Sequence, residues 1–216
     1  MRIRNYQAGD EKGWIYTKAL AYLFSPFFDD RDSFKPELDK EVFEERLELV
    51  AEEDGQIVGL LDIDIYNQAY SRTYRYAPAN KVAYFSNLAV HPDYQGRGIA
   101  QVLFDTAKRV LKEKDVEKLS IFTRDGNAAN HLYQKWGGQL VCQDWLVIGN
   151  PKAQPAIQFG VDLEAGRLHL SSSDGSHCSY YQREGIYVVA DEASLEQFNI
   201  EKVYQEFTYV IDLLVN

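Results

Sequence analysis

Residues 82–111 read VAYFSNLAV-HPDY-QGRGIA-QVLFDTAKRVL, and this stretch decides the fold. The apolar run up to Val90 is rich in β-forming residues and predicts a strand that ends before Pro92. Gly96 and Gly98 then open an amphipathic helix. Such a strand, glycine-rich turn and helix can hold a phosphate, because the first amides of a helix have no partner within it. The side chains expected on the packed face of this helix are Ile99, Val102, Leu103, Thr106 and Val110.

Length, composition and charge limit the classes of protein to consider. The 216 residues suffice for one large domain, or one domain with an appendage, around a sizeable core. Hydrophobic content of 45% and charged content of 26% are ordinary for a soluble globular protein. A net charge of −10 repels nucleic acid and anionic membranes, so we expect neither as a partner. The charge suits a cationic small molecule, although solubility alone explains it equally well.

The cysteine and histidine pattern bears on location and metal binding. Cys142 and Cys178 allow at most one disulfide, and we expect free thiols in a reducing cytoplasm. The first 14 residues lack the apolar segment of a signal peptide. No apolar run reaches the ~18 residues of a membrane-spanning helix. A metal site is not expected, because no histidine shows the spacing of a ligand set; the histidines are His91, His131, His169 and His177.

The N-terminal third predicts a strand, two helices and a hairpin. Pro36 suits the first turn of a helix, and Asp54-Gly55 is typical of a two-residue hairpin turn. The expected elements are a strand at Arg2–Tyr6, a helix from about Glu11 to Ser25, a second helix from Pro36 to about Leu47, and strands at Leu49–Glu53 and Gln56–Ile65.

Polar side chains alternate with apolar ones along the second hairpin strand. Residues 60–66 read LLDIDIY, which puts Asp62 and Asp64 on the face opposite Leu61 and Ile63. A long tyrosine-rich loop is expected over Asn67–Asn80. A loop of this length in a compact domain is either functional or mobile.

The remainder of the chain predicts three parts. We expect a core over residues 1–149, a β-rich insertion or appendage over 150–200, and a final strand over 201–216 that returns to the core sheet. The elements expected after residue 111 are a strand at Lys118–Thr123, a helix at Asn127–Trp136, a strand at Gln139–Ile148, hairpins turning at 164–166 and 183–185, a helical turn at Ser194–Phe198 and a strand at Lys202–Leu214.

Two motifs give the chain a family resemblance. Residues 87–104, NLAVHPDYQGRGIAQVLF, fit Q/R-x-x-G-x-G/A and resemble the acetyl-coenzyme A motif of the GNAT acyltransferases. In the helix that follows, Ala129, Tyr133 and Gly137 match the A-x-x-x-Y-x-x-x-G pattern of those enzymes. A Rossmann dinucleotide site agrees less well with the sequence, because the last glycine of G-x-G-x-x-G is absent from its expected position.

The resemblance implies an α+β GNAT acyltransferase fold. Its central sheet would be mixed, mostly antiparallel and flanked by helices, with the β-rich C-terminal insertion added. The backbone of Leu88, Ala89 and Val90 would pair with the pantetheine arm of acetyl-CoA. The amides that would hold the pyrophosphate are those of Gln95, Gly96, Arg97, Gly98, Ile99 and Ala100. Gly126 stands where the family often has a cofactor-binding asparagine seven residues before the tyrosine, and the nearby Asn127 and Asn130 are the candidate substitutes.

The resemblance also suggests catalytic residues. Tyr133 would protonate the leaving thiolate, since a phenol is protonated at neutral pH. Some relatives carry a basic glutamate on the strand before the motif, but Tyr84 stands at that position here. Asp62 and Asp64 are the best remaining candidates for the base. An equally good interpretation makes them polar residues on a solvated sheet face.

These observations predict an N-acetyltransferase that moves the acetyl group of acetyl-CoA directly to a primary amine of a small molecule. Two alternatives stay open: acetylation of a peptide or protein amine, and a non-catalytic acyl-CoA binding or sensing module. We expect the loops Phe27–Asp32 and Tyr66–Tyr76 to influence the choice of acceptor. The insertion is equally consistent with a homodimer contact, a cover over the acceptor site, or decoration of the fold.

Overall fold

The computed structural model describes residues 1–23, 25–27, 32–124, 126–153, 157–162, 167–179, 182 and 185–214. The helices are α1 (Glu11–Tyr22), α2 (Gln68–Thr73), α3 (Ile99–Glu113) and α4 (Asn127–Lys135), with short 3-10 turns at Ala8–Asp10, Pro92–Tyr94 and Glu192–Gln197. The strands are β1 (Arg2–Asn5), β2 (Phe43–Glu53), β3 (Gln56–Tyr66), β4 (Val82–Val90), β5 (Lys118–Arg124), β6 (Gln139–Pro151), β7 (Ile157–Asp162), β8 (Arg167–Ser172), β9 (His177–Cys178), β10 (Gly185–Val189) and β11 (Phe198–Asp212).

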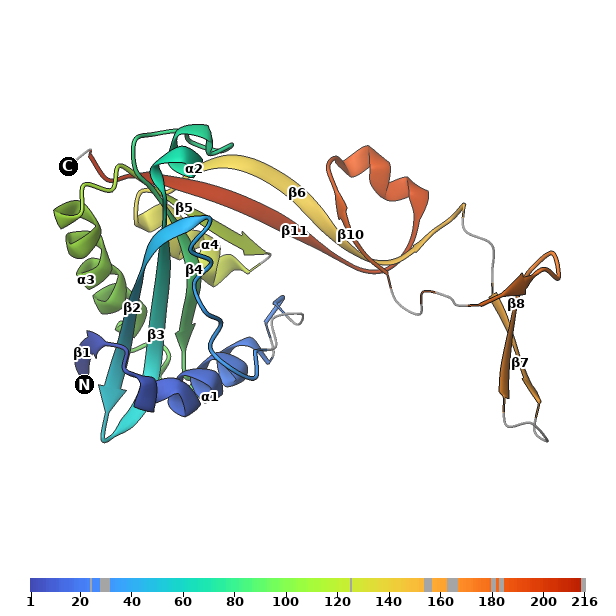
Figure 1. Ribbon diagram of the computed structural model, residues 1–216, viewed down its shortest axis with the longest axis horizontal. Helices are drawn as coiled ribbons and strands as arrows, with labels where there is room; N and C mark the ends of the chain where they lie inside the picture. The colour runs from blue at the N-terminus through green and yellow to red at the C-terminus, as the bar shows by residue number, and fades with distance from the viewer. Residues whose placement is uncertain are drawn as a thin grey trace. The chain divides into compact units, whose positions relative to one another are not determined.

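The main sheet has the strand order β1-β2-β3-β4-β5-β11-β6-β10, and β7-β8-β9 form a second sheet. The first four strands pair antiparallel, whereas β4 and β5 run parallel. The predicted mixed, mostly antiparallel sheet with flanking helices is thus confirmed (Figure 1).

Contacts divide the chain into two units. One unit comprises Met1–Cys142 and Phe207–Asn216, and the other comprises Gln143–Glu206. The long strands β6 and β11 each contribute residues to both units. The three parts expected from the sequence, with boundaries at 149 and 200, stay a prediction about how the chain is organised.

Each face of the sheet in the first unit is covered by different helices. Leu61, Ile63 and Ile65 of β3 lie in the large core with α3 and α4. On the opposite face, Trp14 of α1 packs with Leu60 and neighbouring apolar residues. Successive side chains of β3 therefore point into two different cores. The face that carries Asp62 and Asp64 is covered rather than open to solvent.

Several expected elements are found and some expectations are wrong. The hairpin forms through Asp54 and Gly55, whose φ values of 51° and 78° suit a tight turn. No helix begins at Pro36: β2 starts at Phe43, because Phe43–Glu53 pairs along the whole of β3, and this pairing outweighs local helix propensity. The long loop after β3 contains the short helix α2, which the asparagine at 67 caps by accepting from the Tyr70 amide at 3.1 Å.

The second unit pairs differently from expectation. β7 and β8 form the predicted antiparallel hairpin, although its turn at 164–166 lies outside the described residues. The hairpin expected around 183–185 is wrong: β9 pairs with β8, whereas β10 pairs antiparallel with β6. Local sequence pattern shows which segments are strands but not which distant strand each one meets.

The packed face of α3 is rotated from the expected one. Leu103 is fully buried against the sheet, whereas Val102 is 42% exposed. Gly59 of β3 allows Ile99 to pack closely against the sheet, because a Cβ at position 59 would lie 2.8 Å from the Ile99 side chain. The helix thus packs through Ile99, Leu103, Phe104, Ala107 and Leu111.

We predict unequal costs for two adjacent substitutions in α3. Leu103→Ala should lower the free energy of unfolding by about 2–5 kcal/mol, because it leaves a cavity in the core. Val102→Ala should cost less than about 0.5 kcal/mol, because that side chain already meets solvent. Urea unfolding followed by circular dichroism measures both, and equal losses would contradict this packing.

Candidate active site

Beyond Phe85, one edge of strand β4 pairs with no strand in the part of the chain that the structure describes. β4 and β5 pair only from Val82 to Phe85, opposite Lys118–Ile121, although β4 continues to Val90. The segment Ser86–Val90 therefore has a described strand neighbour only on its β3 side. A backbone edge left free in this way can pair with an extended ligand as though with another strand.

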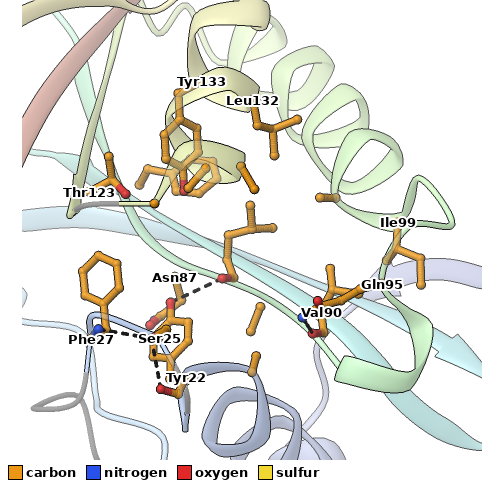
Figure 2. A pocket seen from close by; sticks show the side chains of 18 of the residues that line it. Tyr22, Ser25, Phe27, Asn87, Val90, Gln95, Ile99, Thr123, Leu132 and Tyr133 are labelled. Atoms are coloured by element: carbon orange, nitrogen blue, oxygen red, sulfur yellow. Dashed lines mark hydrogen bonds between the residues drawn. The ribbon is translucent and has the colours of Figure 1, made fainter.

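A cavity of about 1010 Å³ lies along this edge, and we call it the β4 cavity. Residues of α1, β4, the glycine turn, β5 and α4 line it (Figure 2). Of the site residues expected from the sequence, the cavity brings together Leu88, Ala89, Val90, Gln95, Gly96, Gly98, Ile99, Ala100 and Tyr133.

The glycine turn has a backbone that favours glycine. Gly96 and Gly98 have φ values of 74° and 76°, and a Cβ at either position would have open space. The left-handed conformation, rather than crowding, is therefore what these positions require. The first hydrogen bond into α3 runs from the Val102 amide to the Gly98 carbonyl at 3.1 Å. The first amides of α3 have no acceptor within the helix and lie at the positive end of its 15 residues. Of the amides expected to hold the pyrophosphate, that of Gln95 already donates to the Pro92 carbonyl at 3.3 Å.

Tyr133 extends from α4 into the β4 cavity (Figure 2). Its ring packs against Phe85 at 5.9 Å and Trp136 at 5.7 Å between centroids, and the residue is only 8% exposed. Burial raises the pKa of the Tyr133 phenol, and the nearby Tyr84 raises it further. The phenol thus keeps its proton at neutral pH and can donate it.

Asp62 and Asp64 are buried, at 1% and 4% exposure, so the interpretation as residues of a solvated face is wrong. Arg46 holds Asp64 through two hydrogen bonds. Asp62 Oδ2 accepts from Lys35 Nζ at 2.7 Å, and also from Trp14 Nε1. Sequence pattern missed this because Arg46 was expected in a helix and Lys35 in the loop before it, so neither was expected to lie beside β3.

Asp62 is connected to the β4 cavity through one side chain. Neither carboxylate lines the cavity, but Asn87 does, and its Nδ2 donates to Asp62 Oδ2 at 3.2 Å. Burial raises the pKa of Asp62, and the Lys35 ammonium offsets part of that effect. The other oxygen, Oδ1, is buried without a hydrogen-bond partner among the described residues.

Three further predicted residues lie outside the cavity lining. The Arg97 side chain is 55% exposed and stacks over the Tyr94 ring at 4.6 Å. Asn130 accepts from the Tyr209 hydroxyl at 3.1 Å and so joins α4 to β11. Asn127 begins α4, and its side chain lies outside the described residues, as do residues 28–31 of the acidic loop.

The sequence reasoning missed the cavity residues Tyr22, Asn87 and Arg124, and it missed the side chain of Gln95, of which only the backbone amide was expected to act. Tyr22 of α1 donates to the Leu88 carbonyl at 3.3 Å, and Gln95 Nε2 donates to the Val90 carbonyl at 3.1 Å. Arg124 of β5 donates to the Pro26 carbonyl and lies 5.0 Å from the Phe27 ring. Asn87 stood within the quoted motif, but only the backbone of that motif was considered. Nothing in the sequence pattern marks Tyr22 or Arg124.

Comparison with known proteins agrees with this geometry. The family model described as "Acetyltransferase (GNAT) family" matches residues 17–138. The chain belongs to the GNAT acetyltransferases. It is thus an enzyme that uses acetyl-CoA as cosubstrate, and the alternative of a non-catalytic binding module is set aside.

Individual relatives are moderately similar. A protein of Bacillus subtilis (strain 168), provisionally named a ribosomal protein bS18-alanine N-acetyltransferase, is 33% identical over 126 residues, covering 58% of this chain and 72% of that protein. An acetyltransferase of Yersinia pestis (strain Pestoides F) is 32% identical over 152 residues, covering 69% of this chain and 94% of that protein. The crystal structure of the ribosomal-protein-S18-alanine N-acetyltransferase from Escherichia coli aligns with a TM-score of 0.53 over 98% of this chain and 93% of that chain; at 15% identity this shows the fold.

Two features are absent from the described residues. No helix among them is long and apolar enough to cross a membrane. Within the same part of the chain, no group of three His, Cys, Asp or Glu side chains is arranged to hold a metal ion.

We predict that Gly98→Val weakens CoA binding at least about tenfold, since a side chain at positive φ strains the turn that presents the helix amides. Gly55→Val is the matched control, because Gly55 has φ 78° and equally open space but lies in the β2–β3 turn. Isothermal titration with CoA measures the affinities. Equal losses in the two folded variants would contradict a role for the glycine turn in binding.

Proposed function

We propose that this GNAT enzyme transfers the acetyl group of acetyl-CoA directly to a primary amine of a small molecule. The uncovered edge at Ser86–Val90 is the observation that carries this proposal. Pantetheine would pair there, the amides from Gln95 to Ala100 would hold the pyrophosphate, and the thioester would lie near Tyr133. The cavity lining is consistent with this arrangement.

The proposed reaction needs one proton donor and one proton acceptor. The neutral amine nitrogen attacks the thioester carbonyl carbon, the new C–N bond forms, and the C–S bond breaks. The Tyr133 phenol gives its proton to the departing thiolate. The proton lost by the amine passes to a base, directly or through water.

Asp62 is the better of the two candidate bases. Its pKa is raised by burial, so its affinity for a proton exceeds that of an ordinary aspartate, and it contacts Asn87 of the cavity. Asp64 is held by the Arg46 guanidinium, which is not among the described residues that line the β4 cavity. Asp64 is kept as the second candidate.

A second candidate function is acetylation of a peptide or protein amine. The relative from Bacillus subtilis favours it, because its provisional name assigns it an alanine of ribosomal protein bS18. Thiol release from acetyl-CoA separates the two functions when small amines and short peptides with free α-amines are compared. Turnover confined to peptides would overturn the small-molecule proposal.

Other expectations from the sequence also stand as proposals. We place the enzyme in the cytoplasm, without nucleic acid or a membrane as partner. The β-rich insertion keeps the three roles that the sequence left open: a homodimer contact, a cover over the acceptor site, or decoration of the fold.

We predict that Tyr133→Phe lowers kcat by about 100-fold or more and leaves CoA affinity unchanged, because only the proton donor is removed. Tyr209→Phe is the matched control, since this hydroxyl lies on a neighbouring buried ring and donates to Asn130. Steady-state thiol release and CoA titration test both variants. Wild-type turnover in Tyr133→Phe would exclude the phenol as the acid.

We predict that Asp62 sets the acidic limb of the pH–rate profile. The carboxylate must be ionised to accept a proton, so the rate falls as pH drops through its pKa. Burial raises that pKa, so the limb lies above the ordinary value of about 3.9. Asp62→Asn should remove the limb while CoA affinity, measured in parallel, confirms folding; Asp64→Asn should retain it. An unchanged profile in Asp62→Asn would favour a water chain instead.

A further inference from the structure

A second cavity of about 530 Å³ shares a wall with the β4 cavity. Five tyrosines line it, and we call it the tyrosine pocket: Tyr66, Tyr70, Tyr74, Tyr76 and Tyr84. Tyr84 of β4 and Phe122 of β5 line both cavities. These two residues stand where β4 and β5 begin to separate, so the tyrosine pocket lies directly beside the cavity that Tyr133 lines.

The tyrosine pocket is held firmly by hydrogen bonds and ring contacts. The Tyr74 hydroxyl donates to Ser120 Oγ of β5 at 2.7 Å. Ser71, fully buried in α2, donates to the Tyr66 carbonyl and accepts from the Val82 amide at 3.1 Å. The rings of Tyr66, Tyr74 and Tyr76 follow one another at centroid distances of 5.1 and 5.7 Å. A pocket tied to three structural elements loses little entropy when a ligand enters.

The charges around the tyrosine pocket select against a second ammonium group. Arg75 is the only charged residue among the described residues that line it. Burial raises the pKa values of Tyr66 and Tyr74, so these phenols are neutral at pH 7. The walls therefore offer aromatic surfaces, hydroxyls and one positive charge, and no lining carboxylate that would hold a polyamine.

We propose that the tyrosine pocket is the acceptor subsite and takes the body of a monoamine with an aromatic ring that is neutral or anionic away from the amine. This inference rests on the proposed function. The ring lies among the tyrosines, where offset or edge contacts between aromatic rings are favourable. The amine nitrogen extends past Tyr84 and Phe122 to the thioester. There the C–N bond forms, the C–S bond breaks, and Tyr133 protonates the thiolate.

Three probe amines test the class of acceptor: 2-phenylethylamine, 4-(2-aminoethyl)benzoate and 1,4-diaminobutane. We expect kcat/KM for 2-phenylethylamine to exceed that for the diamine by about tenfold or more. Because Arg75 carries a positive charge, the benzoate should be used at least as well as 2-phenylethylamine. Equal or better use of the diamine would overturn the inference.

Variants of the tyrosine pocket test its location. Tyr76→Leu should raise KM for 2-phenylethylamine about tenfold while the Kd of CoA is unchanged, and Tyr76→Phe, which keeps the ring, should restore the wild-type KM. Tyr16→Leu is the matched control, because Tyr16 is 58% exposed on α1 and lines neither cavity. An unchanged KM in Tyr76→Leu would overturn the inference.

Binding measured without turnover separates this inference from the proposed function. The CoA-loaded enzyme is titrated with 2-phenylethylamine by calorimetry. Binding that is lost in Tyr76→Leu supports the pocket even if no probe is acetylated, and the absence of turnover then counts against the proposed function alone. Acetylation of other amines without binding of 2-phenylethylamine overturns the pocket and leaves the proposed function standing.

Discussion

The separation of β4 from β5 after four paired residues is the constraint on which the site depends. Backbone amides and carbonyls buried without partners are costly, so an uncovered strand edge inside a protein needs other partners. Tyr22 and Gln95 supply hydrogen bonds to the Leu88 and Val90 carbonyls. A ligand with the amide groups of pantetheine suits the rest of this edge. The separation of the two strands therefore leaves backbone groups that need hydrogen-bond partners, and the same groups form a binding surface.

On the face of the sheet that α1 covers, the Asp62 carboxylate joins several segments through hydrogen bonds. Three donors from different segments converge on Asp62 Oδ2: Trp14 of α1, Lys35 of the segment before β2, and Asn87 of β4. An extra residue in β4, Ser86, creates a bulge at this point, and its hydroxyl donates to the Asp62 carbonyl at 3.1 Å. Bulges redirect strands and their side chains. Here the bulge coincides with the place where β4 leaves β5, so this network and the open edge form one structural unit.

The sequence predicts the fold well wherever a local rule applies. Gly98 needs a left-handed backbone, and Asp54-Gly55 needs a tight turn, so these positions could be placed from residue type alone. The helix expected from Pro36 failed because pairing with β3 is a long-range effect that outweighs local preference. The environment of Asp62 was equally out of reach: alternation gives its face, but only the packed α1 shows that the face is buried. The tyrosine pocket likewise depends on Ser120 and Phe122, which lie some fifty residues after Tyr70.

The two cavities differ in how tightly their chemistry is constrained. The β4 cavity, in which we propose that acetyl-CoA binds, offers mainly the free backbone edge of β4 and the glycine turn. The tyrosine pocket is lined by side chains, and five of them come from α2 and the segment directly after it: Tyr70, Thr73, Tyr74, Arg75 and Tyr76. Among the described residues, Tyr84 and Phe122 alone line both cavities. Acceptor choice is therefore separable from cofactor binding at every position except these two, and a substitution at either of them should alter both properties together.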